Sequence, residues 1–228
     1  EFRRVLFRSV KNSPSPEWLK RRLKAIGLRP ISALVDITNF ITFAHGRPLH
    51  VFDAAKVKGD IRARLARAGE TIAALDGKTH ALTPTMTVIA DDNGPEAIAG
   101  IIGGEASGCA ETTTDVFLEA AYFDPLRTAA TGRKLGIVSD ARYRFERGVD
   151  PAFTPMGVEI ASRMILELCG GEASHVVTAG AIPATARSFT LRPSRVKALG
   201  GTDLAVDAQK RILESLGFRV TETPAGLS

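Results

Sequence analysis

Cysteine is almost absent from this sequence of 228 residues, which contains only Cys109 and Cys169. Two cysteines so far apart in the chain form neither a zinc-ligand pair nor a CxxC redox motif, and they do not build a disulfide scaffold. This scarcity favours a reducing compartment. We therefore expect a cytoplasmic protein.

Long apolar runs are also missing, and no single sign of charge dominates. No run approaches the ~18 residues of a membrane-spanning helix, and the first residues lack the apolar core of a signal peptide. Lysine and arginine outnumber aspartate and glutamate by 30 to 25, which gives a net charge of +5 and a pI of about 9.5. This mild excess favours an anionic partner without requiring one. We expect no membrane partner and no DNA partner.

The motifs of common catalytic sites are missing as well. The sequence has no Gly-x-Ser-x-Gly elbow, His-Glu-x-x-His motif, phosphate-binding loop or cluster of metal ligands. Histidine occurs only 4 times, and a lone histidine is more often structural than catalytic. Of the four histidines, only His50 is a candidate site residue. Pro48 keeps the chain before His50 extended, so His50 is presented from a loop or strand. We predict no metal site.

The residues that are present suit a folded domain of helices and strands. Hydrophobic residues make up 44% of the chain, enough for a substantial core. Ser15 followed by Pro16 is typical of a helix N-cap and first turn, and Asp76 with Gly77 predicts a turn between two strands. Helices are predicted from the spacing of apolar residues over residues 16–26, 34–43, 125–135, 153–169 and 208–216.

Two strand-like segments carry unusual residues. The run 97–102 contains Gly100 and ends at Gly103, and these glycines allow either a close approach to a ligand or a tight turn between strands. The run 116–122 has Glu119 in its middle, where a charge is costly unless it meets solvent or hydrogen-bond partners. The open face of an edge strand explains this glutamate equally well.

The most distinctive stretch is residues 139–151, SDARYRFERGVDP. Its arginines carry fixed charge, and Tyr143 and Phe145 supply apolar contact between them, a mixture that suits an anionic or nucleic-acid ligand. The alternative is an ordinary amphipathic element with its arginine heads in water and its rings in the core. The pattern alone leaves both interpretations open.

This stretch resembles a segment of the editing module in the β chain of bacterial phenylalanyl-tRNA synthetase. Three further segments resemble the same module in the same order, so the resemblance covers roughly residues 11–183. They are NSPSPEWLKRRLKAIGLRPISALVDITNF, GRPLHVFD, and AIAGIIGG followed by FLEAAYFDP. Several long motifs make this resemblance specific.

The resemblance implies an α+β fold of mixed sheets with flanking helices, in which residues 11–183 form the editing domain. Residues 184–228 resemble the beginning of a small α/β winged-helix-like module, truncated here, and the polar segment 183–187 is the expected boundary. Residues 1–10 do not resemble the family. We interpret them as a non-native remnant and exclude them from the expected fold.

Members of this family hydrolyse tyrosine wrongly attached to phenylalanine tRNA, because a pocket for the phenyl ring rejects an added hydroxyl by only about a hundredfold. Matched by position, the resemblance implies that Glu119 accepts a hydrogen bond from the tyrosine hydroxyl and that the Gly100 N–H donates one. Gly103 shapes the same loop. The other residues implied to line the pocket are Pro48, His50, Leu75, Ser139 and Ala141, with serine at 139 where the family often has threonine.

The resemblance also implies a mechanism and partners. We expect Asn39 and His50 to position the hydrolytic water, helped by the terminal hydroxyl of the tRNA and without a protein nucleophile. Arg142 and Arg144 are candidate tRNA contacts. The implied partners are tRNA(Phe) and the α subunit, in an assembly of two α and two β chains. ATP and Mg2+ are implied for the whole synthetase, with no cofactor in this chain.

Two other functions stay open. The chain could be a freestanding hydrolase that edits aminoacyl-tRNA in trans, although an incomplete second module argues against it. It could also be a non-catalytic segment that binds tRNA or scaffolds subunits, with a vestigial pocket. The residues present at positions 50, 100 and 119 argue against that reading.

Overall fold

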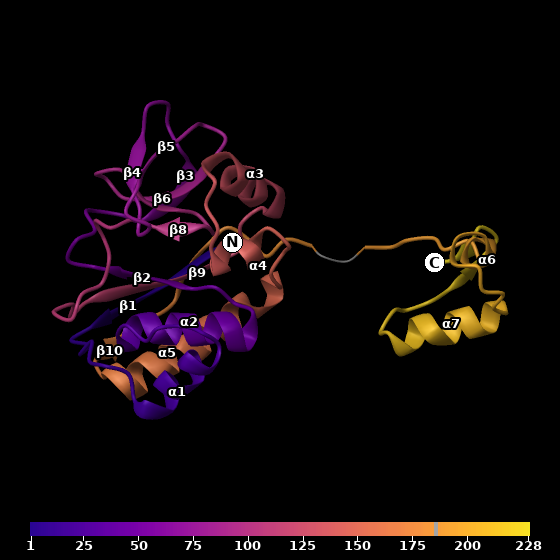
Figure 1. Cartoon of the computed structure of the whole chain (residues 1–228), viewed down its shortest axis with the longest axis horizontal. Coiled ribbons are helices and arrows are strands. Elements are labelled where there is room, and N and C mark those ends of the chain that lie inside the picture. Colours follow the sequence, from indigo (N-terminus) through magenta and orange to yellow (C-terminus); the bar gives the residue numbers. More distant parts are fainter. Residues whose placement is uncertain (185–186) are drawn as a thin grey trace. The chain divides into compact units, whose positions relative to one another are not determined.

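The computed structural model describes residues 1–184 and 187–228. They form two compact units, Glu1–Pro183 and Ala184–Ser228 (Figure 1). The division falls at the polar boundary predicted over residues 183–187, of which residues 185 and 186 lie outside the described residues.

The first unit is built on a five-stranded sheet covered by helices on one face (Figure 1). Its strand order is β10 (Glu172–Ala173), β1 (Phe2–Arg8), β9 (Val116–Ala121) and β2 (His50–Asp53), and β11 (Val177–Ala179) also pairs with β1. The covering helices are α1 (Glu17–Ala25), α2 (Ala33–His45) and α5 (Thr154–Cys169). Their apolar faces and the sheet share one core, which includes Leu23, Ile37, Leu118 and Val158.

A second sheet lies beyond the open face of the first (Figure 1). Its order is β3 (Arg62–Leu65), β6 (Thr87–Ala90), β7 (Pro95–Ile98) and β8 (Ile102–Gly103), and a separate hairpin joins β4 (Thr71–Ala73) to β5 (Thr79–Ala81). Gly77 has a φ of 74° in that hairpin, as the predicted turn requires. The remaining elements of the unit are α3 (Pro125–Leu135), α4 (Asp140–Phe145) and the 3-10 turn η1 (Pro151–Phe153).

The α+β class is confirmed, with two differences in the sheets. Mixed sheets were expected, but every strand pairing in the described residues is antiparallel. In addition, β9 lies between β1 and β2, so the edge-strand explanation of Glu119 is wrong. A buried position in a central strand leaves its carboxylate without the solvent that an edge strand offers.

The exclusion of residues 1–10 from the fold is also wrong. These residues supply β1, which pairs with β9 from Phe2 opposite Ala121 to Phe7 opposite Val116. Val5 and Phe7 alternate into the core and are buried, so the segment has the period of a half-buried strand. Motif resemblance could not reveal this, because strand pairing requires only the alternation. A non-native origin of the segment stays a prediction.

The N-cap predicted for the first helix is wrong. Pro16 precedes α1, and no side chain caps the helix. The Ser15 hydroxyl instead donates a hydrogen bond of 2.6 Å to Oδ2 of Asp36, and both residues are buried. A buried carboxylate needs such a donor more than an exposed helix end does. This bond ties the start of α1 to α2.

The second unit contains two helices and a small hairpin. The helices are α6 (Ser194–Gly200) and α7 (Val206–Ser215), and β12 (Glu222–Thr223) pairs with β13 (Gly226–Leu227). This composition agrees with a small α/β module, and its winged-helix character stays a prediction. No helix in either described part of the chain is long and apolar enough to cross a membrane.

Candidate functional site

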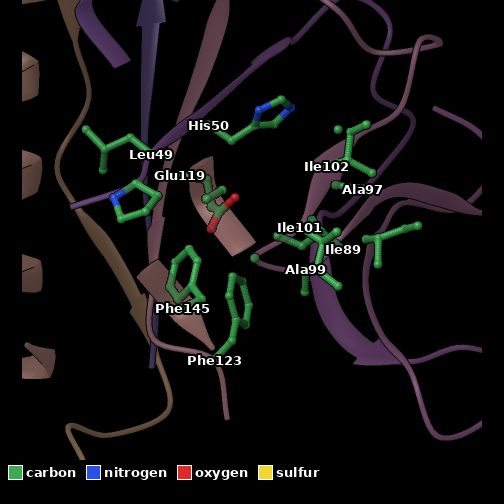
Figure 2. Close-up of a pocket in the computed structure, with 15 residues that line it drawn as sticks. Leu49, His50, Ile89, Ala97, Ala99, Ile101, Ile102, Glu119, Phe123 and Phe145 are labelled. Atoms are coloured by element: carbon green, nitrogen blue, oxygen red, sulfur yellow. The ribbon is translucent and has the colours of Figure 1, made fainter. Parts of the chain in front are cut away.

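A pocket of the first unit opens between the two sheets, against α4 (Figure 2). It has a volume of about 130 Å³. An apolar cavity of ~150 Å³ holds a benzene ring, so the space suits one aromatic side chain. The residues that line it are Pro48, Leu49, His50, Ile89, Ala97, Ile98, Ala99, Gly100, Ile101, Ile102, Gly103, Glu119, Phe123, Ala141 and Phe145.

Glu119 and His50 form the sheet wall of this pocket. They face each other across the β9–β2 pairing, and Figure 2 shows the Glu119 carboxylate projecting into the space below the His50 ring. Glu119 is 6% exposed, and no other group among the described residues forms a hydrogen bond with its carboxyl group. Burial raises the pKa of Glu119 to about 8, against the opposing effect of the positive charge on Arg47. This carboxyl group is therefore available to a ligand.

His50 is held as a neutral ring. Burial lowers the pKa of His50 to about 4, and its Nε2 is buried without a hydrogen-bond partner among the described residues. The ring stands edge-on to Phe52 with ring centroids 4.4 Å apart. A Cβ on Gly103 would lie 2.5 Å from its Cε1, so glycine is required there. A neutral imidazole has one N–H that donates a hydrogen bond and one nitrogen that accepts one.

Gly100, Phe123 and Phe145 form the opposite, turn wall. The strand predicted over residues 97–102 is interrupted, because β7 ends at Ile98 and the chain turns through Gly100 at a φ of 69°. A Cβ there would lie 3.0 Å from ring atoms of both phenylalanines, whose centroids are 5.2 Å apart. In the described part of the chain the Gly100 N–H has no hydrogen-bond partner. The turn wall thus offers apolar surface and one free donor.

Most of the predicted site residues meet in this pocket. Pro48, His50, Gly100, Gly103, Glu119 and Ala141 all line it. Three others do not belong to the lining. Leu75 is 56% exposed and lies beside Gly103, while Asn39 lies half-buried on α2. Ser139 caps α4 and donates a 2.6 Å hydrogen bond to the Ile101 carbonyl, so it holds the turn wall in place. The role predicted for Asn39 stays a prediction.

The arginines of residues 139–151 do not enter the pocket. Arg142 donates to Glu146 at 2.9 Å and to the Ile137 carbonyl, and its side chain passes over Gly132 of α3. Arg144 bonds Asp140 and lies over the ring of Phe43, with 4.4 Å between its Cζ and the ring centroid. Both guanidinium groups are engaged within the protein, and their contact with tRNA stays a prediction.

Sequence reasoning missed two residues that line the pocket and one buried arginine next to a lining residue in the chain. Phe123 carried no signal of its own, and Phe145 was interpreted as apolar contact without being placed in the pocket. Arg47, next to Pro48 in the chain, carried no signal of burial but is 1% exposed. A buried arginine has no sequence signature, because its partners come from distant segments.

The α+β fold holds a pocket with space for one aromatic ring, and sequence comparison gives the family of this domain. The B3/4 domain family matches residues 1–170, and the chain belongs to that family. It is 67% identical over 222 residues to the phenylalanine–tRNA ligase beta subunit of Paramagnetospirillum magneticum, covering 97% of this chain and 28% of the relative. The resemblance to the β chain of phenylalanyl-tRNA synthetase is thereby confirmed.

Other relatives carry the same name. The phenylalanine–tRNA ligase beta subunit of Cereibacter sphaeroides is 61% identical over 211 residues, covering 92% of this chain and 26% of the relative. The chain thus spans about a quarter of the length of these relatives. A crystal structure of an N-terminal fragment of the phenylalanyl-tRNA synthetase β subunit from Pyrococcus horikoshii aligns with a TM-score of 0.46 at 13% identity, covering 99% of this chain and 62% of that chain.

Proposed function

We propose that this chain is part of the β subunit of a phenylalanine–tRNA ligase and that its pocket hydrolyses tyrosine wrongly esterified to phenylalanine tRNA. One observation carries the proposal. Among the described residues, the Glu119 carboxyl group and the Gly100 N–H both lack partners, and both line a pocket of the size of one aromatic ring whose other lining is apolar except for the neutral His50 ring. This pair suits a ring that bears a hydroxyl.

The pair explains how the pocket distinguishes tyrosine from phenylalanine. A tyrosine hydroxyl donates a hydrogen bond to a carboxyl oxygen of Glu119 and accepts one from the Gly100 N–H, while Phe123 and Phe145 contact the ring. Phenylalanine leaves both polar groups unpaired, at a cost of ~1–3 kcal/mol for each. The pocket therefore reads the hydroxyl that the synthetic site rejects poorly.

Hydrolysis needs an oriented water, because an aminoacyl ester is already activated. The water oxygen attacks the ester carbonyl carbon and gives up a proton, the bond to the ribose oxygen breaks, and the ribose oxygen takes that proton and leaves as a hydroxyl group. Neutral His50, Asn39 and backbone groups position the water, and the neighbouring ribose hydroxyl of the tRNA assists. No protein nucleophile is required.

The remaining activity of the parent enzyme belongs to other parts of the assembly. We assign phenylalanine activation, with its ATP and Mg2+, to the α subunit, and we infer a cytoplasmic assembly of two α and two β chains. Within the described residues, no group of three or more His, Cys, Asp or Glu side chains could hold a metal ion. The steps proposed here use only this chain and the tRNA.

The test is deacylation of tyrosyl- and phenylalanyl-tRNA(Phe) by the purified chain and two variants. Glu119→Gln should reduce tyrosyl ester cleavage at least about tenfold and lower its preference over the phenylalanyl ester. Glu96→Gln is the matched control, because Glu96 is also a buried carboxylate but does not line the pocket. We expect its selectivity to equal that of the wild type.

Each other outcome has a defined meaning. If the folded chain cleaves neither ester but binds tRNA, the non-catalytic reading replaces the proposal. If Glu119→Gln cleaves tyrosyl ester with unchanged selectivity, another group reads the hydroxyl. If the chain edits alone as fast as when combined with an α subunit and complete β subunit, the freestanding hydrolase is favoured over a synthetase part.

A further inference from the structure

Arg47 is the largest fully buried side chain of the described residues, at 1% exposure. It lies between α2 and β2, directly before Pro48, and its guanidinium donates three hydrogen bonds. Nη1 donates to the Ala121 carbonyl at 2.7 Å. Nη2 donates to the Asp150 carbonyl at 3.1 Å and to the Thr154 hydroxyl at 2.9 Å.

These acceptors come from three separate elements. Ala121 ends β9, Asp150 precedes η1, and Thr154 begins α5. The stem of Arg47 reaches them only because Gly157 of α5 has no side chain, since a Cβ there would lie 2.8 Å from Cγ of Arg47. Arg47 thus joins the segment that carries Pro48 and His50 to the strand that carries Glu119 and to α5.

All three acceptors of Arg47 are uncharged groups, so no carboxylate among the described residues neutralises its charge through a hydrogen bond. Burial accordingly lowers the pKa of Arg47, while the charges of Glu119, Asp150 and Glu1 act in the opposite direction. Burying a cation without a bonded anion is costly, and a purely structural link could be made with neutral side chains. Nη1 of Arg47 bonds the Ala121 carbonyl, two residues along β9 from Glu119, so the buried charge lies near that carboxyl group.

We propose that Arg47 is a positioning residue of the pocket, which fixes the Pro48–His50 segment against the end of β9 and places a positive charge near the Glu119 carboxyl group. Its effect on editing rests on the proposed function, whereas its effect on Glu119 does not. The ionised form matters because a carboxylate accepts the tyrosine hydroxyl bond more strongly than the neutral acid does.

The groups that face Glu119 from the other elements differ from Arg47 as sources of positive charge. Opposite it on β2 is His50, which is neutral because burial lowers its pKa to about 4. Opposite it on β1 is Arg4, whose Cζ lies 5.2 Å from the centroid of the Phe117 ring. The turn wall and α4 contribute only uncharged lining residues, among them Ile101 and Ala141.

Titration of Glu119 in the 228-residue chain tests the proposal without relying on activity. The side-chain carboxyl carbons are labelled with 13C, and Glu119→Gln identifies the signal of Glu119 in NMR spectra recorded across pH. Arg47→Met should raise the midpoint of that signal by about one pH unit or more, because a nearby positive charge has been removed. Arg47→Lys keeps the charge and should leave the midpoint within about half a unit.

Two controls separate charge from packing. Arg163→Met makes the same substitution on exposed α5 surface, where Arg163 pairs with Glu159, and should not move the Glu119 midpoint. Thr154→Val removes one hydrogen-bond acceptor of Arg47 but no charge. It should also leave the midpoint unchanged.

Deacylation of tyrosyl-tRNA(Phe) supplies the second measurement. In Arg47→Met the rate near neutral pH should fall about tenfold, and its pH profile should move upward with the Glu119 midpoint. Arg47→Lys should lose part of the rate without moving the profile, since the single ammonium nitrogen of lysine cannot reproduce the planar, spread donors of the guanidinium group. A role in packing alone would lower the rate equally at every pH.

An unchanged Glu119 midpoint in folded Arg47→Met would overturn the proposal. Should that variant fail to fold, Arg47→Lys decides, and a shift of its midpoint by about a full unit or more is then the contradicting result. If the wild-type chain cleaves neither ester, the editing function is refuted, while the NMR titration still decides the role of Arg47.

Discussion

The two walls of the pocket differ in how they are built. The sheet wall places His50 and Glu119 on neighbouring strands, where the ladder fixes both backbones and burial shifts both pKa values. The turn wall consists of Gly100 at a positive φ between two phenylalanine rings. The sheet wall thus holds its polar side chains on a hydrogen-bonded ladder, whereas the turn wall presents apolar rings around one free N–H group.

The largest expected effect comes from removing a ring of the turn wall. Phe145 is 3% exposed, so Phe145→Ala should lower the free energy of unfolding by about 3–5 kcal/mol, through lost burial and a new cavity. Urea unfolding measures the change. Tyr143→Ala on the same helix is the control, because Tyr143 is exposed and should lose less than about 1 kcal/mol. Equal losses of unfolding free energy in the two variants would show that Phe145 is packed no more tightly than the exposed Tyr143.

The next effect concerns the sheet wall and depends on pH. Glu119 has a pKa of about 8 in the folded chain against an ordinary value of 4.5, so the folded state binds the proton more tightly than the unfolded state. Its contribution to stability is full below pH 4.5 and is lost as pH rises to about 8. Glu119→Gln should remove this loss and stabilise the chain by several kcal/mol above pH 8, since one pKa unit corresponds to about 1.4 kcal/mol.

His50 provides the control of opposite sign. Burial lowers its pKa from 6.5 to about 4, so its contribution is present above pH 6.5 and is lost as pH falls toward 4. His50→Gln should therefore stabilise the chain relative to wild type near pH 4 but not above pH 6.5. Urea unfolding across pH measures both variants. Identical pH profiles for the two would contradict the sheet wall described here.

Gly100→Ala tests how tightly the turn wall is packed, and we expect an intermediate loss of stability. The positive φ alone should cost about 1–2 kcal/mol, and the new Cβ would also press on both rings. Gly136→Ala is a matched control, because Gly136 has a φ of 67° and a Cβ there would meet no atom within 4 Å. Thermal unfolding should show a larger loss of stability for Gly100→Ala than for Gly136→Ala. Equal losses would mean that the two phenylalanine rings move aside without cost when the Cβ is added.

The smallest effect is expected at Ser139, which holds the turn wall from outside. Ser139→Ala removes the cap of α4 and the bond to the Ile101 carbonyl, and should cost about 1–2 kcal/mol. Ser139→Thr should keep both bonds. Asp124→Ala is the control, because it removes the cap of α3 without touching the turn. Tyrosyl ester cleavage should fall in Ser139→Ala and not in Asp124→Ala.

The candidate site was predictable where long motifs matched the family position by position. Six residues identified in that way line the pocket, including Glu119 and Gly100. The matches did not reveal how each residue acts, so Ser139 was expected in the lining although its hydroxyl holds the turn. Phe123 and Arg47 were missed because their importance depends on contacts with distant segments.

Local pattern by itself determined the main helices and the turn at Gly77, since spacing of apolar residues and glycine conformation act within a few residues. The family motifs added the α+β class. Only the tertiary structure decided that β1, β9 and β2 are neighbours and that Glu119 lies in a central strand. It also decided the shifted pKa values of Glu119 and His50 and the burial of Arg47. Burial and charge proximity are properties of segments far apart in the chain, and no local pattern encodes them.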